Sequence, residues 1–333
     1  MGSMHSTILF LLPTTIALVG EFSLTSVDLL LRGHHKIVIN CGSGLKLYSN
    51  NLKVKETGVI VKAMNIKGYK MDGLGNDFLI IDQRQNPVVL TSAQIKKLAD
   101  RNNLGFDQLI YIEPGNNSIP NILFYNSDGG ESTACGNGSR CVAYLLMEEQ
   151  KSKTVSLNTK SGILESFHNG DKNITIDMGE PMFEWNKIPL VTNIDSSNIT
   201  INLKEHGTFN GFSLSVGNPH IIFFEEIEIN KLKIIGPIIE HHSYFPERCN
   251  VTFASIIDKE NIKIKVWERG AGLTKACGTA ACATLVAAYK KELSNRVVNI
   301  HFDNGRLLID WKTNNHIYMT GPVSDIKLIN IDI

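Results

Sequence analysis

Two cysteines, Cys135 and Cys277, are the strongest candidates for chemistry because their surroundings match. Each is the centre of an Ala-Cys-Gly tripeptide that precedes a helix-like run, so each thiol is expected beside the positive end of a helix dipole, which favours the thiolate. A thiol with an ordinary pKa of about 8.5 can therefore coexist with a second, ionised thiol near neutral pH. Such a pair could act as base and acid on opposite faces of one carbon atom, which is what inversion of a stereocentre requires.

The first residues of the two predicted helices supply groups that this chemistry needs. Backbone N–H groups of Gly136, Asn137, Gly278 and Thr279 would bind a carboxylate next to the reacting carbon and receive the negative charge that develops on deprotonation. The two glycines let the backbone come close to a ligand. The scheme needs no cofactor and no metal.

Cysteine spacing argues against a zinc or redox site. Cys135 and Cys141 are six residues apart, and Cys277 and Cys282 are five apart, whereas structural zinc sites and redox dithiols use Cys-x2-Cys. Burial as an inert small side chain is the usual fate of a free cysteine. That interpretation is retained for the remaining four cysteines: Cys41, Cys141, Cys249 and Cys282.

The chain contains an internal repeat. Four pairs of polar or nucleophilic residues share one offset of 142 residues: Asn76 and Asn218, Gln108 and Asn250, Asn126 and Glu268, and Cys135 and Cys277. The members of each pair also lie at equivalent ends of similar strand-like or helix-like runs. The repeat predicts two homologous halves, residues 64–190 and 191–333, preceded by an N-terminal extension, residues 1–63.

The expected elements are many short strands and a few helices. β-Branched and aromatic runs bounded by Asn, Asp and Gly predict strands at 121–125, 173–178, 263–267 and 306–311. Helices are predicted at about 137–150 and 279–292, the second apolar nearly all round and hence buried, and at 92–101 with Thr91 as N-cap. The expected fold class is α+β, with two pseudo-symmetric halves of antiparallel strands wrapped around a central helix and an active site in the cleft between them.

Composition narrows the class of protein. The 333 residues carry 33 Lys and Arg against 33 Asp and Glu, and this zero net charge argues against a nucleic-acid partner. Six cysteines are too few for a disulfide framework and predict reduced thiols in the cytoplasm. The apolar run at 8–20 contains Pro13 and is too short to cross a bilayer, so no membrane association is expected. Residues 1–63 are predicted to be poorly ordered or not native, and a chain beginning at Met64 is expected to fold and act alone.

The motifs around these residues resemble those of the diaminopimelate epimerases, and the resemblance extends from residue 64 to about 330. Each motif is specific and they occur in the family's order. They are GLGNDF at 73–78, NSDG at 126–129, ACGNGSR at 134–140, GNPH at 217–220, WERGAG at 267–272 and ACGT at 276–279.

The resemblance implies an isomerase that converts LL-diaminopimelate to the meso form without pyridoxal phosphate, in the synthesis of lysine and peptidoglycan precursors. It implies Cys135 and Cys277 as the acid and base, and a homodimer. Arg269 suits a substrate carboxylate and Glu268 an ammonium group, while His220 is a candidate for tuning a thiol. The implied pocket consists of Asn76, Gln108, Asn126, Asn218, Asn250, Glu268 and Arg269.

Some positions depart from the family's usual pattern, and two other functions stay open. The departures are Asp72, Gly130, Leu273 and Ala280. Leu273 removes a carboxylate close to Cys277, which affects the expected rate more than the expected reaction. The alternatives are a racemase or epimerase of proline or hydroxyproline, which would not need a Glu268–Arg269 pair, and a binding protein for a dibasic amino acid that has lost the chemistry.

Overall fold

A computed structural model describes residues 27–29, 39–41, 54–55, 58–59, 65–132 and 135–332. The chain divides into two compact units, residues 1–66 with 331–333 and residues 67–330. In the first unit, β1 (Val27–Leu29) pairs antiparallel with β2 (Ile39–Cys41), and β3 (Val54–Lys55) with β4 (Gly58–Val59). The expectations for residues 1–63 otherwise lie outside the described residues.

The second unit contains the repeat. Its first half comprises β5 (Asn65–Gly73), β6 (Asn76–Asp82), α1 (Ser92–Ala99), β7 (Gln108–Glu113), η1 (Asn116–Ser118), β8 (Asn121–Asn126), β9 (Glu131–Ser132), α2 (Gly136–Gln150), β10 (Thr154–Thr159), β11 (Gly162–His168) and β12 (Asn173–Asp177). Its second half comprises β13 (Ile199–Asn202), η2 (Lys204–His206), β14 (Thr208–Ser215), β15 (Pro219–Phe223), α3 (Ile229–Glu240), β16 (Asn250–Asp258), β17 (Asn261–Glu268), β18 (Gly272–Thr274), α4 (Gly278–Lys290), β19 (Val297–Phe302), β20 (Gly305–Trp311), β21 (Ile317–Pro322) and β22 (Lys327–Asp332).

The two halves repeat their strand register as well as their elements. Phe78 lies opposite Gln108 in the β6–β7 pair, and His220 lies opposite Asn250 in the β15–β16 pair, each residue being displaced by 142 positions from its counterpart. The α+β class with two pseudo-symmetric halves is therefore confirmed. The predicted boundary between residues 190 and 191 falls between β12 and β13, and the domain limits themselves stay a prediction.

Parallel strand pairs are a feature that the expected antiparallel arrangement did not include. β6 and β7 are parallel, as are β15 and β16, although most neighbouring strands are antiparallel. Parallel neighbours need a crossover connection, because a hairpin turn reverses the chain. α1 and α3 lie within these crossovers, so the repeat includes a peripheral helix in each half.

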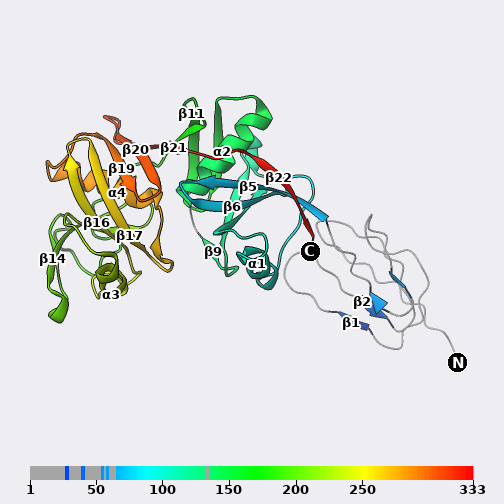
Figure 1. Ribbon diagram of the computed structural model, residues 1–333, viewed down its shortest axis with the longest axis horizontal. Helices are drawn as coiled ribbons and strands as arrows, with labels where there is room; N and C mark the ends of the chain where they lie inside the picture. Colours follow the sequence, from blue (N-terminus) through cyan, green and yellow to red (C-terminus); the bar gives the residue numbers. More distant parts are fainter. Residues whose placement is uncertain are drawn as a thin grey trace. The chain divides into compact units, whose positions relative to one another are not determined.

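A central helix in each half carries the residues of the site. α2 packs on β6, β10, β11 and β12, and α4 on β14, β15, β16, β19, β20 and β21, as can be followed in Figure 1. Residues of both helices belong to one apolar core. The prediction that the second central helix is buried is confirmed, since ten of its residues are buried. The third predicted helix is confirmed as α1, with Thr91 as N-cap in a capping box with Gln94.

The halves are joined through strands that are each other's repeat. β12 pairs antiparallel with β21, from Asn173 opposite Pro322 to Asp177 opposite Tyr318. Thr175 and Thr320 share a hydrogen bond of 2.7 Å across this pair. The pairing makes a continuous sheet across the junction, and α2 and α4 approach each other beside it.

No helix among the described residues is both long and apolar enough to span a bilayer.

Candidate active site

Cys135 is the N-cap residue of α2. Its backbone is extended, and its Sγ accepts a hydrogen bond of 3.3 Å from the backbone N–H of Gly138. Sγ also lies 3.9 Å from Oδ1 of Asn76, at the start of β6. The thiol is half-buried. It lies where the sequence predicted, beside the first N–H groups of a helix, which have no partner within the helix.

Cys277 occupies the equivalent position as the N-cap residue of α4. Its Sγ lies 3.4 Å from Oγ1 of Thr279, and the residue is 6% exposed. Thr279 was expected to act through its backbone N–H, whereas its side chain also contacts the thiol. The two candidate cysteines thus share an extended backbone at the starts of two buried helices, whereas Cys277 makes no cap hydrogen bond like that of Cys135.

The starts of these helices touch each other. A Cβ atom on Gly136 would lie 3.7 Å from Cα of Gly278 and 2.8 Å from Cε of Met319. The side chain of Asn137 donates a hydrogen bond of 3.5 Å to the backbone carbonyl of Ala276. A side chain at either glycine would displace the end of the Met319 side chain, and the lack of one lets the two cysteine-bearing turns come together.

Burial outweighs the helix ends in setting thiol ionisation. Desolvation raises the pKa of Cys135 to about 12, although N–H groups of Gly138 and Asn137 lower it. Desolvation also raises the pKa of Cys277 well above its ordinary value, and the Glu268 carboxylate raises it further. The prediction that a helix end gives a thiolate near neutral pH is therefore wrong for the unliganded protein, because removal of water dominates.

Amide side chains from β6, β7 and β8 form the N-terminal part of the site. Nδ2 of Asn76 donates to a carboxylate oxygen of Asp107 at 2.9 Å. Nε2 of Gln108, the first residue of β7, donates to Oδ1 of Asn126, the last residue of β8, at 3.0 Å. Oε1 of Gln108 is buried with no hydrogen-bond partner among the described residues. An unsatisfied acceptor of this kind is suited to a ligand N–H group.

The C-terminal part contains a chain of hydrogen bonds that ends at Cys277. Nε2 of His220 contacts Oδ1 of Asn218 at 2.9 Å, and Nδ2 of Asn218 donates to Oγ1 of Thr279 at 3.3 Å. Since the amide oxygen accepts, Nε2 of His220 carries the proton and Nδ1 is a bare acceptor, for which the described residues offer no partner. His220 is thus linked to the thiol through two intervening side chains.

His220 is neutral in this environment. The ring is fully buried, and desolvation together with the charge of Arg269 lowers its pKa to about 3. A neutral histidine can orient Asn218 but cannot supply a positive charge to the thiol.

Asn250 and Arg269 are in direct contact. Oδ1 of Asn250 accepts from the backbone N–H of Arg269 at 3.0 Å, and its Nδ2 donates to the carbonyl of Pro219 at 3.1 Å. Both ends of the Asn250 amide are therefore hydrogen-bonded to the backbone, at Arg269 and at Pro219. Nη1 of Arg269 donates to the carbonyl of Glu247 at 3.2 Å.

Glu268 is an acidic residue whose charge acts on both thiols. It accepts a hydrogen bond from the hydroxyl of Thr274, and its carboxylate hydrogen-bonds Cys277. Desolvation raises its pKa, and its charge raises the pKa of Cys135 as well as that of Cys277. This carboxylate lies within electrostatic reach of both candidate acid/base groups.

The turn that carries Glu268 and Arg269 is fixed by the buried Glu240 of α3. One of its carboxylate oxygens accepts from Nε1 of Trp267 at 2.7 Å, and the other accepts from the backbone N–H of Gly270 at 2.9 Å. The flanking residues of the charged pair are therefore both anchored to one side chain. Sequence analysis missed Glu240 because α3 was not predicted.

Two further residues escaped the sequence analysis. Asp107, which holds Asn76, directly precedes Gln108, and this adjacency is the only sequence signal for it. Arg140 lies in α2 five residues after Cys135 and is fully buried. Its presence in the ACGNGSR motif was noted without a role.

The positions that depart from the family pattern have local explanations. Asp72 accepts from the backbone N–H of Gly75 at 3.1 Å and so closes the turn between β5 and β6. The N–H of Gly130 donates to Asp128 at 2.7 Å. Ala280 is completely buried in α4, and Leu273 is 37% exposed on β18. None of these residues disrupts the geometry around the cysteines.

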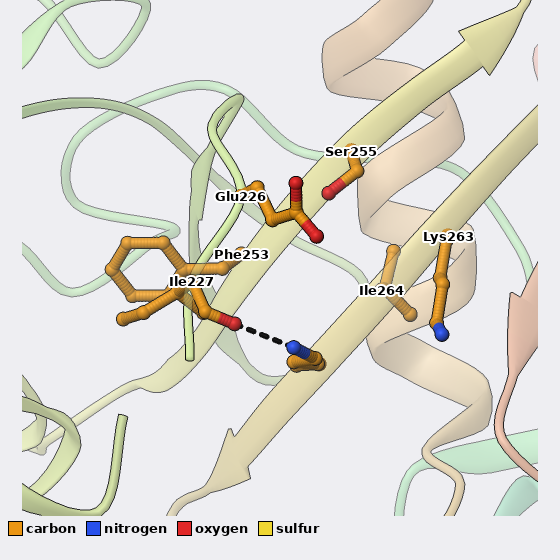
Figure 2. Close-up of a pocket in the computed structure, with 7 residues that line it drawn as sticks. Glu226, Ile227, Phe253, Ser255, Lys263 and Ile264 are labelled. Atoms are coloured by element: carbon orange, nitrogen blue, oxygen red, sulfur yellow. Dashed lines mark hydrogen bonds between the residues drawn. The ribbon is translucent and has the colours of Figure 1, made fainter. Parts of the chain in front are cut away.

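One pocket of the described chain lies apart from this site. A small pocket between β16, β17 and the segment before α3 is shown in Figure 2. Lys265 also lines this pocket, and its Nζ donates to the carbonyl of Ile227. Neither cysteine and none of the site amides line it. Among residues 65–132 and 135–332, no three His, Cys, Asp or Glu side chains gather as metal ligands.

Comparison with known structures supports the fold. The chain matches a hydroxyproline epimerase from Agrobacterium vitis with a TM-score of 0.60 and 11% identity, over 81% of this chain and 93% of that one. It matches a PhzF-family phenazine biosynthesis protein from Bacillus anthracis with a TM-score of 0.57 and 14% identity, over 81% and 100%. At these identities the similarity concerns architecture alone.

Sequence comparison identifies the family. The diaminopimelate epimerase family model matches residues 68–184 and 212–326. The diaminopimelate epimerase of Pelagibacter ubique is 50% identical over 274 residues, which is 81% of this chain and 100% of that protein. The enzyme of the same name from Caulobacter sp. strain K31 is 42% identical over 270 residues, or 77% and 93%. The chain belongs to the diaminopimelate epimerase family.

Proposed function

We propose that this protein is an isomerase that interconverts LL- and meso-diaminopimelate, with Cys135 and Cys277 as the base and acid. The observation that carries the proposal is the contact between the first turns of α2 and α4, each of which begins at a candidate cysteine. Two equivalent thiols on converging helix starts are suited to approach one carbon from opposite sides. Membership of the family supports diaminopimelate as the substrate.

The proposed reaction moves one proton off the α-carbon and another onto it. One cysteine, as thiolate, takes the α-proton, and the electron pair of the broken C–H bond spreads into the adjacent carboxylate. N–H groups at the two helix starts, at Gly136, Asn137, Gly278 and Thr279, stabilise that charge. The other cysteine, as thiol, then delivers a proton to the opposite face. The product has the inverted configuration, and the two thiols have exchanged protonation states.

The charged residues of the site suit the remaining groups of the substrate. Glu268 lies close to both thiols, so it would bind the ammonium group next to the reacting carbon. Arg269 would bind the carboxylate of the other end by paired hydrogen bonds. The half-buried amides of Asn76, Asn126, Gln108 and Asn218 would orient the substrate without adding net charge. For Asn250 we propose an indirect contribution through Arg269, since its amide is already engaged.

The test is incubation of the purified protein with LL-diaminopimelate in deuterated water, without added pyridoxal phosphate. α-Deuterium incorporation followed by NMR, together with appearance of the meso isomer, is the expected result. Cys135→Ala and Cys277→Ala should each abolish inversion. Cys249→Ala is the control for loss of a buried thiol, because Sγ of Cys249 contacts the carbonyl of Ile239 and Cys249 does not start either central helix, and it should retain turnover.

Other outcomes would redirect the assignment. Deuterium uptake with proline or hydroxyproline in place of diaminopimelate would favour a racemase of the same fold. Tight binding of diaminopimelate without loss of its α-proton, by a folded protein with reduced thiols, would identify a binding protein. Turnover retained in either cysteine variant would exclude the two-thiol mechanism.

The proposal also covers the setting of the enzyme. We place it in the cytoplasm as a homodimer that acts in lysine and peptidoglycan precursor synthesis. Residues 64–190 and 191–333 form the two halves of the enzyme, and residues 1–63 are dispensable. Sedimentation of the full chain and of a chain beginning at Met64 measures the oligomer. Loss of soluble protein on that truncation would contradict a dispensable extension.

A further inference from the structure

Arg140 is a fully buried cation within the first turns of α2. Its Nη2 donates to Oδ1 of Asn137 at 2.8 Å, and its Nη1 lies 3.7 Å from Sδ of Met319. Nε has no hydrogen-bond partner in the described part of the chain. A Cβ on Gly321 would lie 3.1 Å from the guanidinium carbon, so the group is also tightly packed.

The positive charge of Arg140 has no paired carboxylate. None of the ion pairs formed by residues 65–132 and 135–332 includes it. A guanidinium stays protonated in proteins, and an unpaired buried charge strongly favours an anion nearby. The groups whose charge acts on Arg140 are the thiols of Cys141, Cys135 and Cys282, and Asp72 on β5. Of these thiols, only Cys135 is not completely buried.

The positive charge of Arg140 has no counterpart at the equivalent position of the second half. The residue equivalent to Arg140, displaced by 142 positions, is Cys282, so α4 has no matching cation. The residue equivalent to Asn126 is Glu268, so β8 ends in a neutral amide where β17 ends in a carboxylate. Both cysteines are N-cap residues beside the positive end of a helix dipole, but Sγ of Cys135 also accepts a hydrogen bond of 3.3 Å from the N–H of Gly138, whereas Cys277 makes no such cap bond. This bond and the two side-chain differences have the same sign, because each favours the anion on Cys135 over the anion on Cys277.

We propose that Arg140 is a positioning residue that makes Cys135 the thiolate and Cys277 the thiol whenever the pair carries one negative charge. The inference rests on the proposed function, because it assigns roles within the same pair. The cation in α2 stabilises the Cys135 anion, and the Glu268 carboxylate keeps the proton on Cys277. In this state the enzyme removes a proton from the side of the substrate that faces α2.

The other charges around the pair leave this order intact. Asp107 and Asp77, near Asn76, are both paired with Arg101. His220 is neutral, and Arg269 acts on His220 and Cys249. On Cys135 the Glu268 carboxylate raises the pKa, and the Gly138 N–H and the smaller effect of Arg140 lower it. On Cys277 Glu268 raises the pKa through both its charge and its hydrogen bond.

The experiment compares initial alkylation rates of the two thiols in the intact, unliganded protein. Iodoacetamide is used at about pH 8.5, below the pKa of both groups, and each modified peptide is quantified by mass spectrometry at low conversion. Under these conditions the rate for each thiol is proportional to its thiolate fraction. The ratio of the Cys135 rate to the Cys277 rate then reports their relative ionisation, and its change between variants does not depend on their different exposure.

Arg140→Gln removes the charge while retaining a donor for Asn137, and Arg140→Lys retains the charge. The ratio should fall about tenfold or more in the Gln variant, which corresponds to a shift of about one pKa unit for Cys135, and should recover in the Lys variant. The rate for Cys277 should stay nearly constant. A merely structural role would instead loosen the site and accelerate both thiols, and an unchanged ratio in a folded Gln variant would equally overturn the proposal.

A second variant keeps the test decisive if Arg140→Gln does not fold. Glu268→Gln removes a charge that raises the pKa of both thiols, and since Glu268 acts on Cys277 also through a hydrogen bond, the variant should increase the Cys277 rate more than the Cys135 rate and so lower the same ratio. An unchanged or increased ratio there contradicts the proposed polarity. Deuterium uptake is measured in parallel on the unmodified protein. Epimerisation with no effect of Arg140 or Glu268 on the ratio would support the proposed function and reject only this inference. The predicted ratios without epimerisation would reject the proposed function and leave the difference in ionisation between the two thiols.

Discussion

The side-chain amide of Asn76 donates from Nδ2 to the carboxylate of Asp107 at 2.9 Å, which turns its Oδ1 toward the thiol of Cys135. A carboxylate only accepts, so this bond fixes which end of the amide faces the sulfur. Asp107 also accepts from the backbone N–H of Asp77 at 3.1 Å and pairs with Arg101. The orientation of a site amide is thus set by a residue that does not itself touch the thiol.

Asp107→Asn should reduce kcat by about 10- to 100-fold, because loss of a charge-assisted hydrogen bond of about 1.5–3 kcal/mol leaves Asn76 free to rotate. Steady-state epimerisation measures the effect, and circular dichroism checks the fold. Asp100→Asn, a change at an exposed carboxylate after α1, is the matched control. Unchanged kinetics in Asp107→Asn would show that the orientation of Asn76 does not matter.

His220→Phe, which introduces the residue found at the equivalent Phe78, should weaken the pH dependence of stability. The folded pKa of about 3 lies below the ordinary 6.5, so the unfolded chain binds more protons between these values and stability falls as the pH drops through this window. From pH 7.5 to 5, His220 accounts for a loss of about 2 kcal/mol in the free energy of unfolding. Urea unfolding at both pH values measures it, and an equal pH dependence in the variant would mean that His220 is charged in the folded protein.

Gly278→Ala should destabilise the junction of the two helices by about 1–3 kcal/mol through overpacking. The added Cβ would lie 2.7 Å from Sδ of Met319, whereas a Cβ on Gly136 would meet the more movable Cε at 2.8 Å, so Gly136→Ala should cost less. Met319→Ala in the Gly278→Ala background should recover part of the loss. A double-mutant cycle with additive effects would exclude this steric contact as the cause.

Leu273→Glu should leave activity unchanged or higher. Side chains alternate along a strand, so Leu273 points away from the side on which Thr274 reaches Glu268, and at 37% exposure it can place a carboxylate in water. Kinetic measurement of the variant beside the unmodified enzyme tests this expectation. A large fall in kcat would show that the site is tuned to the apolar residue.

Oxidation should inactivate the enzyme reversibly by linking Cys135 and Cys277. Both are free thiols at the starts of two helices that contact each other, and a disulfide forms once rearrangement of the site brings their Cβ atoms to about 4 Å. Activity lost with a mild oxidant should return with a thiol reductant, and peptide mapping without reduction should find the cross-link. Two free thiols in an inactivated sample would contradict the mechanism.

The repeat offset allowed much of the site to be predicted from the sequence, because it identified equivalent residues without any knowledge of their contacts. In this way the sequence predicted Cys135 and Cys277 as equivalent residues. It also predicted the starts of β7 and β16, the ends of β8 and β17, and the two central helices. Helix α3 was missed because β-branched isoleucines and Pro237 have low helix propensity, and packing of its buried face overrides that propensity.

Sequence could not reveal the residues whose role depends on tertiary contacts. Asp107 and Asn76 are 31 positions apart, and Glu240 and Trp267 are 27 apart, so their hydrogen bonds follow from strand register and helix placement. The raised pKa values of the thiols were missed for the same reason: a helix end is visible in the sequence, but exclusion of water by the opposite half is not.

The antiparallel pairing of β12 with β21 has a consequence for how such a site can exist. Strands that are each other's repeat meet across this junction as two subunits meet in an isologous dimer, so two separate half-chains would be bound by strict two-fold symmetry. Every residue would then occur identically on both sides of the substrate. Joining the halves in one polypeptide removes that restriction. A residue in one half can then differ from the equivalent residue in the other half. In the proposed reaction the substrate reacts at one end and is held by the other, and a protein that is continuous along the chain can be unsymmetrical enough to treat the two ends differently.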